Sequence, residues 1–372
     1  MKILTLSNYY PEHTGGIEYV ALNLVTRWRR NHQVRWMASD VMDRPHARAV
    51  DDLPMAASNF TEVRLGFPYP IPSGRAVSHI FQQAKWCDLV HIHDCLYLAS
   101  QIAFLASRSY HKPIVVTQHV ALVPYVQAYK NTLQKTAYRT LGRLILEHAE
   151  RVVFISQRVR NWFEKRMHFL HEAAFIPNGV DRGIFYPPTA AERETSRVRL
   201  GFSPDDFVLL FVGRFTEKKG LHLVREIAQA RPHLRWLMIG SGQIDPRAWD
   251  LSNVTVLSPQ SQAGLRELYL AADLFALPSV GEGFPLAVQE ALSCGLPVAV
   301  SEEIANHLPD APLVRLDIAA LPILLETLDG LFATREQLSN LGRAAAEYAK
   351  RWDWAGVARQ YEGLFIELTT SH

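Results

Sequence analysis

The segment from Pro278 to Pro297 combines glutamates, glycines and prolines in a spacing that suits the binding of an anion. It follows an apolar run, passes through a glycine-containing turn and opens a predicted helix over Leu286–Ser293. A helix N-terminus presents free N–H groups and a partial positive charge to an anion. Glu282 lies in the turn, and Glu290 lies about a turn and a half into the helix, so both could approach one ligand. Taken singly, each glutamate is more simply explained as an acid at a helix N-terminus or on a solvated face.

A second loop carries two cations between glycines. The predicted strand Val208–Val212 runs into a loop from Gly213 to Gly220 that contains Arg214 and Lys219. A guanidinium group offers a planar fork to phosphate oxygens, and an ammonium group offers a mobile point charge. Together the two side chains could neutralise a departing diphosphate, although the loop alone would also fit an ordinary solvated surface. A third loop, Gly240–Gly242, follows another predicted strand and is weak evidence by itself.

The first half of the chain contributes glycine and histidine residues at strand ends. Gly16 lies between the first predicted strand and the first predicted helix, where the backbone can approach a substrate because no Cβ intervenes. His119 follows the strand Ile114–Thr117. His91 and His93 share one face of a strand, a spacing that could suit a metal ion. Because no third ligand follows nearby, packing at the strand end or contact with substrate is the favoured interpretation.

The elements that must position these residues alternate between short apolar runs and amphipathic stretches, which is typical of parallel sheets covered by helices. The predicted strands are Lys2–Leu6, Val34–Ala38, Leu89–Ile92, Ile114–Thr117, Val152–Ile155, Val208–Val212, Trp236–Ile239, Val254–Leu257, Leu274–Leu277 and Val298–Val300. The predicted helices are Ile17–Trp28, Thr132–His148, Leu221–Ala230, Leu265–Ala272, Leu286–Ser293 and Trp352–Leu368. The predicted fold class is α/β, with two doubly wound Rossmann-like domains facing across a cleft, and with ligands at the carboxyl ends of the strands. A polar stretch that opens with Pro187 and Pro188 is predicted to be a linker.

Composition supports a two-domain protein and limits its partners. The 372 residues are too many for one ordinary core, and 48% hydrophobic with 20% charged residues is a globular composition. Up to Phe185 the chain has 22 Lys and Arg against 14 Asp and Glu, a net charge of +8, and the remainder has 17 against 23, a net charge of −6. The basic half suggests an anionic membrane surface or a phosphate-bearing substrate. Nucleic acid is not expected, because no nucleic-acid-binding motif accompanies the charge.

The sequence predicts a cytoplasmic protein. The apolar start is interrupted by Ser7, Asn8 and Pro11 before any cleavage pattern, and no run reaches the roughly 18 apolar residues of a membrane span. The cysteines form no CxxC pair and suit a reducing compartment. Neither a metal site nor a cofactor is predicted.

Together these segments resemble the retaining family 4 glycosyltransferases of GT-B fold (glycosyl transferases group 1), over nearly the whole chain. The most specific match is the pair Glu282 and Glu290, separated by seven residues within Glu282–Val298. The loop from Val212 to Gly220 resembles the family's donor-diphosphate loop, and Ile176–Asp181 resembles the segment that closes its N-terminal domain. His119 falls where the family has an active-site histidine.

The resemblance implies a role for each matched residue and a division of the chain. Arg214 and Lys219 would bind the diphosphate, and Glu290 would accept hydrogen bonds from the ribose. Glu282 would contact the transferred sugar beside the backbone of Gly283 and Phe284. His119 would lie at the anomeric centre, and Gly16 would approach the phosphates. The implied divisions are an acceptor-side domain over 1–185, a linker over 186–200, a donor domain over 201–351 and a final helix over 352–372 that crosses back to the N-terminal domain.

The same resemblance implies transfer of a hexosyl unit from a nucleotide-sugar to a glycan or a lipid-linked glycan, in cell-envelope polysaccharide synthesis at the inner membrane face. GDP-mannose and UDP-sugars remain open as donors. The sequence has no Asp-x-Asp pair of the kind that clamps a metal–diphosphate complex, so metal-independent transfer is expected. Pro285 stands where the family frequently has glycine, which removes one backbone N–H from the sugar pocket.

Four alternative functions can be compared with the sequence. A nucleotide-sugar epimerase of the same fold would need no acceptor, and a phosphorylase would need a cofactor-lysine motif that is not found. A nicotinamide-dependent oxidoreductase would need GxGxxG at the first helix, and the turn from Pro11 to Gly16 lacks that spacing. A catalytically silent nucleotide-sugar-binding protein would keep the binding residues without turnover.

Overall fold

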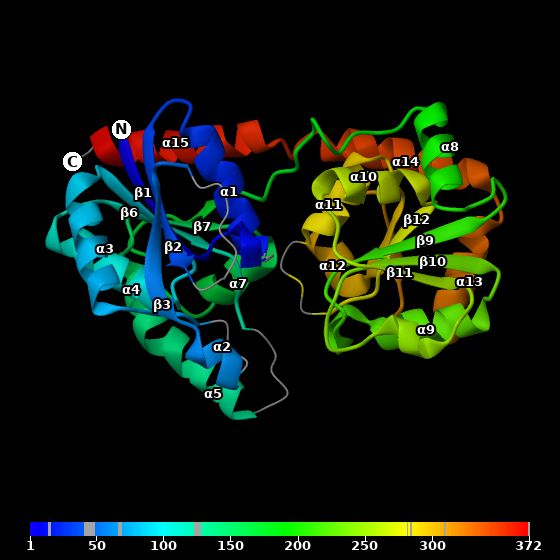
Figure 1. The fold of residues 1–372 in the computed structure, drawn as a ribbon, viewed down its shortest axis with the longest axis horizontal. Helices are drawn as coiled ribbons and strands as arrows, with labels where there is room; N and C mark the ends of the chain where they lie inside the picture. Colours follow the sequence, from blue (N-terminus) through cyan, green and yellow to red (C-terminus); the bar gives the residue numbers. More distant parts are fainter. Residues whose placement is uncertain are drawn as a thin grey trace. The chain divides into compact units, whose positions relative to one another are not determined.

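A computed structural model describes residues 1–13, 16–40, 49–65, 69–122, 128–280, 282, 285–308 and 310–370. The chain divides into two compact units (Figure 1). Unit 1 comprises Met1–Gly179 together with Trp354–His372, and unit 2 comprises Val180–Asp353. Each unit is a sheet with helices packed on it.

Unit 1 contains an eight-stranded sheet in the order β4-β3-β2-β1-β5-β6-β7-β8. All neighbours are parallel except β3 and β4, which pair antiparallel. The central strands β5 and β6 are buried along their whole length, as expected for a sheet covered on both faces. The strands are β1 Lys2–Tyr9, β2 Gln33–Asp40, β3 Asp52–Ser58, β4 Ile71–Pro72, β5 Leu89–His93, β6 Ile114–Gln118, β7 Arg151–Phe154 and β8 Ala174–Phe175. The helices are α1 Gly16–Trp28, α2 Phe60–Leu65, α3 Gly74–Trp86, α4 Leu98–Ser109, α5 Ala128–Ala137, α6 Arg143–His148, α7 Gln157–Glu164 and α15 Trp354–Thr370.

Unit 2 contains a six-stranded parallel sheet in the order β11-β10-β9-β12-β13-β14. The change of direction in strand order falls between β9 and β12, which is where doubly wound sheets bind ligands. The strands are β9 Phe207–Val212, β10 Leu234–Ile239, β11 Val254–Leu257, β12 Leu274–Leu277, β13 Val298–Ser301 and β14 Leu313–Leu316. The helices are α8 Ala190–Arg199, α9 Leu221–Ala230, α10 Gln262–Ala271, α11 Leu286–Ser293, α12 Glu302–His307, α13 Leu321–Phe332 and α14 Arg335–Ala349.

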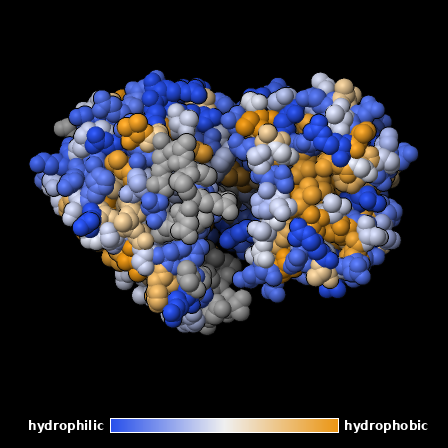
Figure 2. All heavy atoms as spheres, viewed as in Figure 1, coloured by the Kyte–Doolittle hydropathy of each residue, from blue (hydrophilic) through white to orange (hydrophobic). Residues whose placement is uncertain are grey.

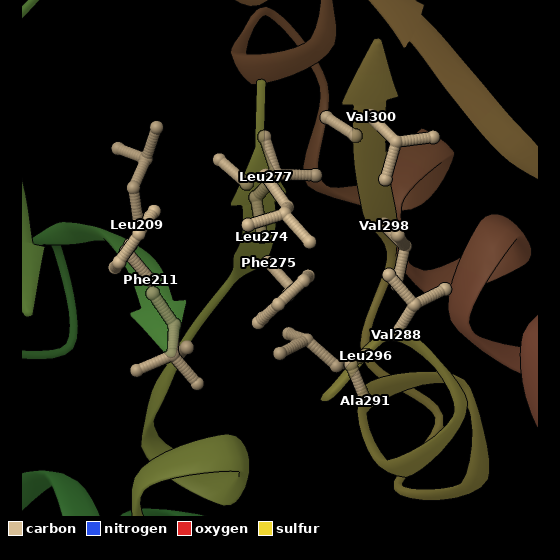
Figure 3. Close-up of a cluster of buried hydrophobic side chains, with 14 of the residues drawn as sticks. Leu209, Phe211, Leu274, Phe275, Leu277, Val288, Ala291, Leu296, Val298 and Val300 are labelled. Carbon is tan, nitrogen blue, oxygen red and sulfur yellow. The ribbon is translucent and has the colours of Figure 1, made fainter. Parts of the chain in front are cut away.

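Helix α11, which carries Glu290, is fixed to the sheet by its apolar face. Val288 and Ala291 are fully buried and belong to the same core cluster as Phe275 of β12. Figure 3 shows these side chains packed between the strands and the helix, with Leu296 completing the contact. The helix ends at Ser293, with Cys294 as its C-cap. Gly295 follows with a positive φ of 68°, the left-handed conformation that glycine adopts without strain.

Helix α15, the last in the chain, packs on unit 1. Its buried residues Tyr361 and Phe365 join the core around Trp28 of α1, and Trp28 Nε1 donates to the carbonyl of Ala358 at 3.2 Å. The visible faces of the two units are largely hydrophilic, with more hydrophobic side chains on unit 2 (Figure 2). In the part of the chain that the structure describes, no helix is both long and apolar enough to cross a membrane.

The strands predicted from the sequence are confirmed, and those over Val254–Leu257 and Leu274–Leu277 have the predicted bounds. The α/β class with two parallel sheets is confirmed too. The helix predicted over Thr132–His148 begins earlier, at Ala128, and contains a π-helical turn over Tyr138–Gly142 between α5 and α6.

The predicted linker over 186–200 is wrong for most of its length, because α8 occupies Ala190–Arg199. Thr189 caps this helix, and its hydroxyl and the Glu192 side chain each bind the other residue's backbone N–H. Helix α8 has no apolar stripe. It is held instead by Arg193 and Arg197, which form ion pairs with Asp273 next to β12.

Candidate functional site

Two loops at the carboxyl edge of the unit 2 sheet are bound to each other. One follows β9 and runs from Gly213 to Gly220, and the other follows β12 and leads to α11. The backbone N–H of Val280 donates to the carbonyl of Lys218 at 2.8 Å, which joins the two loops. Gly220 has a φ of 75°, and a Cβ added there would lie 2.2 Å from the carbonyl oxygen of Pro278. Glycine is therefore required for this close approach of the loops.

The approach of the loops brings Lys219 and Glu282 together. Lys219 Nζ lies 3.0 Å from Glu282 Oε1, and only 13% and 12% of the two side chains are exposed. Lys218 Nζ lies further away, at 3.8 Å from the same oxygen. In this state the ammonium group of Lys219 is neutralised by a carboxylate. An incoming diphosphate would have to compete with Glu282 for that cation. Binding of the diphosphate would then replace the Lys219–Glu282 ion pair with a contact between Lys219 and the phosphate.

Arg214 and Pro285 are the other predicted residues of these loops that the structure describes. Arg214 is exposed, and the described part of the chain shows no hydrogen bond or ion pair of its side chain. The structure therefore does not bring Arg214 into contact with Lys219 or Glu282. Gly283 and Phe284, predicted to touch the transferred sugar, lie outside the described residues. Pro285 occupies the N-cap position of α11, directly before the first helical residue, Leu286.

Glu290 is buried, with 9% of its surface exposed, and it has a partner that the sequence did not indicate. The hydroxyl of Tyr269, from α10, donates to Glu290 Oε2 at 2.9 Å. Burial raises the pKa of Glu290 to about 7, and the hydrogen bond from Tyr269 opposes this shift. The solvated-helix-face interpretation of Glu290 is therefore wrong, because a carboxylate on such a face would be neither buried nor bound by a buried tyrosine.

His119 lies at the carboxyl end of β6 in unit 1, buried against His93 at the end of β5. His93 Nδ1 and His119 Nε2 are 2.9 Å apart, and the rings stack at 5.2 Å between centroids. Burial lowers the pKa of His119 to about 3 and lowers the pKa of His93 well below its usual value. Both imidazoles are therefore neutral near pH 7, and one must donate to the other.

The surroundings of His93 indicate which imidazole donates. His93 Nε2 is buried without a hydrogen-bond partner among the described residues. A buried N–H without an acceptor is rarer than an unused lone pair, so the His93 proton belongs on Nδ1. His93 then donates to Nε2 of His119, and His119 carries its own proton on Nδ1. In this tautomer His119 keeps one N–H to offer to a ligand.

Among the described residues, His91 and His93 have no third side chain placed to complete a metal site. Their rings are 4.6 Å apart, but His91 Nε2 bonds Thr117 Oγ1 at 2.8 Å, and Thr117 bonds Tyr361 of α15 at 3.0 Å. The described ranges contain no group of three His, Cys, Asp or Glu side chains placed to hold a metal ion.

The N-terminal end of α1 carries Gly16, whose Cα faces open space among the described atoms. Beside it lies a polar cluster that sequence reasoning missed. Glu62 of α2 accepts from the Tyr9 hydroxyl at 2.9 Å and contacts His13 Nε2 at 3.1 Å. The Tyr9 and His13 rings stack at 3.8 Å. These residues are distant in sequence and carry no motif, so only the fold shows that they meet at the end of β1.

Two doubly wound sheets, the second with a basic loop and two glutamates at its switch point, are the arrangement expected of the GT-B glycosyltransferases. Residues 14–183 match Glycosyltransferase Family 4, and residues 192–307 match Glycosyl transferases group 1. The chain belongs to the family 4 glycosyltransferases of GT-B fold.

Named relatives and solved structures agree with this assignment. D-inositol 3-phosphate glycosyltransferase of Segniliparus rotundus is 29% identical over 299 residues, which are 73% of this chain and 64% of that relative. The chain thus matches less than two thirds of the length of that curated relative. Sucrose-phosphate synthase from Thermosynechococcus elongatus is similar in fold, with a TM-score of 0.80, 18% identity and 100% of both chains covered. Anabaena HepE in complex with UDP-glucose has a TM-score of 0.73 at 20% identity and covers 100% of both chains.

Proposed function

We propose that this chain is a retaining, metal-independent glycosyltransferase that moves a hexosyl unit from a nucleotide-sugar to a glycan or lipid-linked glycan in cell-envelope polysaccharide synthesis. The observation that carries the proposal is the Lys219–Glu282 pair beside the N-terminus of α11, with Glu290 buried further along that helix. The UDP-glucose complex of HepE supports a UDP-sugar donor, with GDP-mannose the alternative. The name of the Segniliparus relative adds a phosphorylated polyol to the acceptors worth testing.

In the proposed reaction the bond between the anomeric carbon and the diphosphate oxygen breaks as the bond to the acceptor oxygen forms on the same face. The acceptor hydroxyl passes its proton to the leaving phosphate. Lys219 and Arg214 stabilise the negative charge that develops on the diphosphate, and the dipole of α11 adds to this. Glu290 accepts hydrogen bonds from the ribose. Glu282, released from Lys219, contacts the transferred sugar beside Gly283 and Phe284.

The proposal also assigns roles to two residues of unit 1, as the resemblance to the family implies. The Nδ1–H of neutral His119 donates to an oxygen of the sugar beside the anomeric centre, and the backbone at Gly16 approaches the phosphates. Neutral His119 is suited to donating a hydrogen bond, and it adds no positive charge beside an oxocarbenium-like sugar.

A panel of nucleotide-sugars tests the function most directly. We expect one donor class to raise the melting temperature and to be hydrolysed slowly without acceptor and faster with one. Turnover should persist in EDTA, since Lys219 and Arg214 supply the charge that a metal would. Loss of turnover in EDTA that Mg²⁺ or Mn²⁺ restores would contradict metal-independent transfer. Turnover without any acceptor dependence, with an isomerised sugar as product, would favour the epimerase alternative.

The two glutamates should respond differently to substitution. The ribose changes little as the glycosidic bond breaks, so Glu290→Ala should raise the donor KM more than it lowers kcat. Glu282→Gln should lower kcat, because charge develops at the sugar. It should not weaken the affinity for the free nucleoside diphosphate, because it removes the carboxylate charge that competes for Lys219. Steady-state kinetics and calorimetric titration of the diphosphate measure both effects. An unchanged KM and diphosphate affinity in Glu290→Ala would contradict the ribose role.

The raised pKa of Glu290 adds a pH signature to this comparison. The protonated acid accepts hydrogen bonds poorly, and burial places its pKa at about 7. The donor KM of the unmodified protein should therefore fall as pH rises through about 7. Glu290→Gln, which cannot ionise, should remove that dependence while retaining an acceptor oxygen. A KM with the same pH profile in both proteins would assign the titration to another group.

We also propose that the α5–α6 surface of unit 1 contacts an anionic membrane. This surface exposes the apolar side chains of Tyr129, Leu133, Leu141 and Leu144. Lys135, Arg139 and Arg143 are exposed in the same stretch, whereas Lys130, also expected there from its spacing, is only 7% exposed and is withdrawn from the proposed contact. Apolar side chains beside basic ones are the combination that binds a membrane interface.

Co-sedimentation with vesicles tests the membrane contact. Each basic residue near an anionic surface contributes about 1 kcal/mol, so Lys135→Glu with Arg139→Glu should weaken binding to phosphatidylserine vesicles by at least about tenfold. Added salt should weaken it as well. The matched control is Lys85→Glu with Lys165→Glu, the same change of charge at exposed positions elsewhere in unit 1. Equal losses in the two double variants, or equal binding to neutral vesicles, would reject this surface.

A further inference from the structure

Unit 2 contains a cavity of about 490 Å³ at the amino edge of its sheet. Asp273, directly before β12, and Pro297, directly before β13, lie in its wall, and α14 closes another side. Because the strands are parallel, this edge is opposite to the one where Lys219 and Glu282 lie. The cavity is therefore separate from the proposed donor site within the same unit.

The cavity is lined by both apolar and basic side chains. Its apolar lining includes Ala272, Leu296, Pro297 and Leu338. Four cations also line it, which are Arg193, Arg335, Arg343 and Lys350. A volume of this size lies within the range of small-molecule sites, and an apolar lining with a few charged groups is usual for them.

The acids in the cavity wall are already neutralised. The Asp273 carboxylate accepts hydrogen bonds from the guanidinium groups of Arg193, at 2.6 Å, and Arg197, at 3.1 Å. It also accepts one from the backbone N–H of Val208, at 2.8 Å. Glu347, the other acid of the wall, pairs with Lys350 at 2.5 Å. Neither carboxylate is therefore available to neutralise the positive charges of Arg335 and Arg343.

Those two arginines retain most of their donors. In the described structure, Arg335 gives one hydrogen bond, from Nη2 to the carbonyl of Pro204 at 2.7 Å, and its guanidinium lies over the ring of Phe207. Arg343 gives one, from Nη2 to Asn340. Each guanidinium group has five N–H donors, so both can still form bidentate hydrogen bonds with an anion. Burial lowers the pKa of Arg193. The like charges of Arg197 and Arg335 lower this pKa further, against the attraction of Asp273.

We propose that this cavity is a second ligand site that binds a phosphorylated small molecule of sugar-phosphate size. The phosphate would be held by Arg335 and Arg343, because planar guanidinium groups match phosphate oxygens in pairs. The body of the ligand would contact the apolar lining residues. An inorganic phosphate alone would leave most of the cavity unfilled.

The ligand would touch residues that hold Glu290. Tyr269 and Cys294 both line the cavity, and Tyr269 is the residue whose hydroxyl binds Glu290. Cys294 is also the C-cap of α11 and donates its backbone N–H to the carbonyl of Glu290 at 3.0 Å. Occupation of the cavity should therefore change donor affinity. This second step rests on the proposed function of Glu290, whereas binding itself does not.

Calorimetric titration with glucose 6-phosphate tests the binding step. We expect saturable binding that is at least tenfold weaker in Arg343→Glu and in Arg335→Glu, and little or no binding of glucose. Arg225→Glu, an exposed charge reversal on α9, is the matched control and should bind normally. Circular dichroism and melting curves identify a variant that has lost its fold. If Arg335→Glu does not fold, the result for Arg343→Glu decides the test, because Asn340 is the one hydrogen-bond partner of Arg343 among the described residues.

Three outcomes would overturn the site. Equal affinity for inorganic phosphate would show that the body of the ligand is not recognised. Binding that is lost in Lys219→Met but kept in Arg343→Glu would place the ligand in the donor site. Absence of saturable binding in the unmodified protein would remove the proposal altogether.

A kinetic measurement tests the second step separately. Saturating glucose 6-phosphate should change the donor KM of the unmodified protein at least twofold and should leave that of Tyr269→Phe unchanged. An unchanged KM in the unmodified protein would overturn the coupling to Glu290. If no nucleotide-sugar is turned over at all, the proposed function fails while the Arg343-dependent binding still stands.

Discussion

Lys219→Met should reduce kcat/KM for the donor by about 10²–10³-fold, the loss typical of removing one preorganised group that stabilises charge in the transition state. Lys219 is the cation that contacts Glu282 most closely, at 3.0 Å, and 13% of its side chain is exposed. Its ammonium group is therefore held where a departing diphosphate would develop charge. Steady-state kinetics with the donor found by screening measures the loss.

Lys218→Met is the matched control for this effect. Lys218 is the next residue along the same loop, and its ammonium group lies 3.8 Å from the same Glu282 oxygen. Its bond to Val280 uses the backbone carbonyl, which the substitution leaves in place. We expect a loss of less than about fivefold, since a more exposed charge is better screened by water. Equal losses in the two variants would show that the loop contributes only general positive charge.

Asp273→Ala should destabilise unit 2 by about 3–5 kcal/mol, because it leaves Arg197 buried without its carboxylate. The side chains of Arg197 and Asp273 are 7% and 8% exposed. For a domain of this size the loss corresponds to a fall of about 6–20 °C in the melting temperature. Differential scanning calorimetry of the full chain measures the change.

Asp329→Ala is the matched control for the stability prediction. Asp329 also receives two hydrogen bonds from one guanidinium group, that of Arg231, at 2.5 and 2.8 Å. Its side chain, however, is 43% exposed. We expect a loss of no more than about 1 kcal/mol, as for other surface pairs. Similar losses in the two variants would mean that burial does not decide the strength of these pairs.

Much of the fold was predictable because strands of parallel sheets are short, continuous apolar runs. Val254–Leu257 and Leu274–Leu277 were located to the residue for this reason. Helix α8 was not, since its burial depends on Arg193 and Arg197 reaching Asp273 rather than on an apolar stripe. A periodicity argument finds no apolar stripe there, because Ala190, Ala191 and Val198 are the only apolar residues of the helix. The Thr189 capping box was a local signal that could have revealed the helix.

The candidate site was predictable as a set of loops but not as a set of contacts. Gly220 and the glutamates could be placed at strand ends, because the carboxyl ends of parallel strands share one edge. The contacts of Lys219 with Glu282, of His93 with His119 and of Tyr269 with Glu290 join residues from different elements. Such pairs depend on how the elements pack, and no spacing within one element encodes them.

The path of the chain through the two units affects how the protein is made. Unit 1 needs α15, whose Tyr361 and Phe365 fill the core around Trp28, yet α15 is translated after all of unit 2. Unit 2 is one continuous stretch, and its two ends are paired, with the N–H of Val180 donating to the carbonyl of Trp352 at 2.8 Å. On the ribosome, therefore, the unit that begins first is completed last. Until then the nascent protein carries an uncovered apolar surface at Trp28, of the kind that chaperones bind.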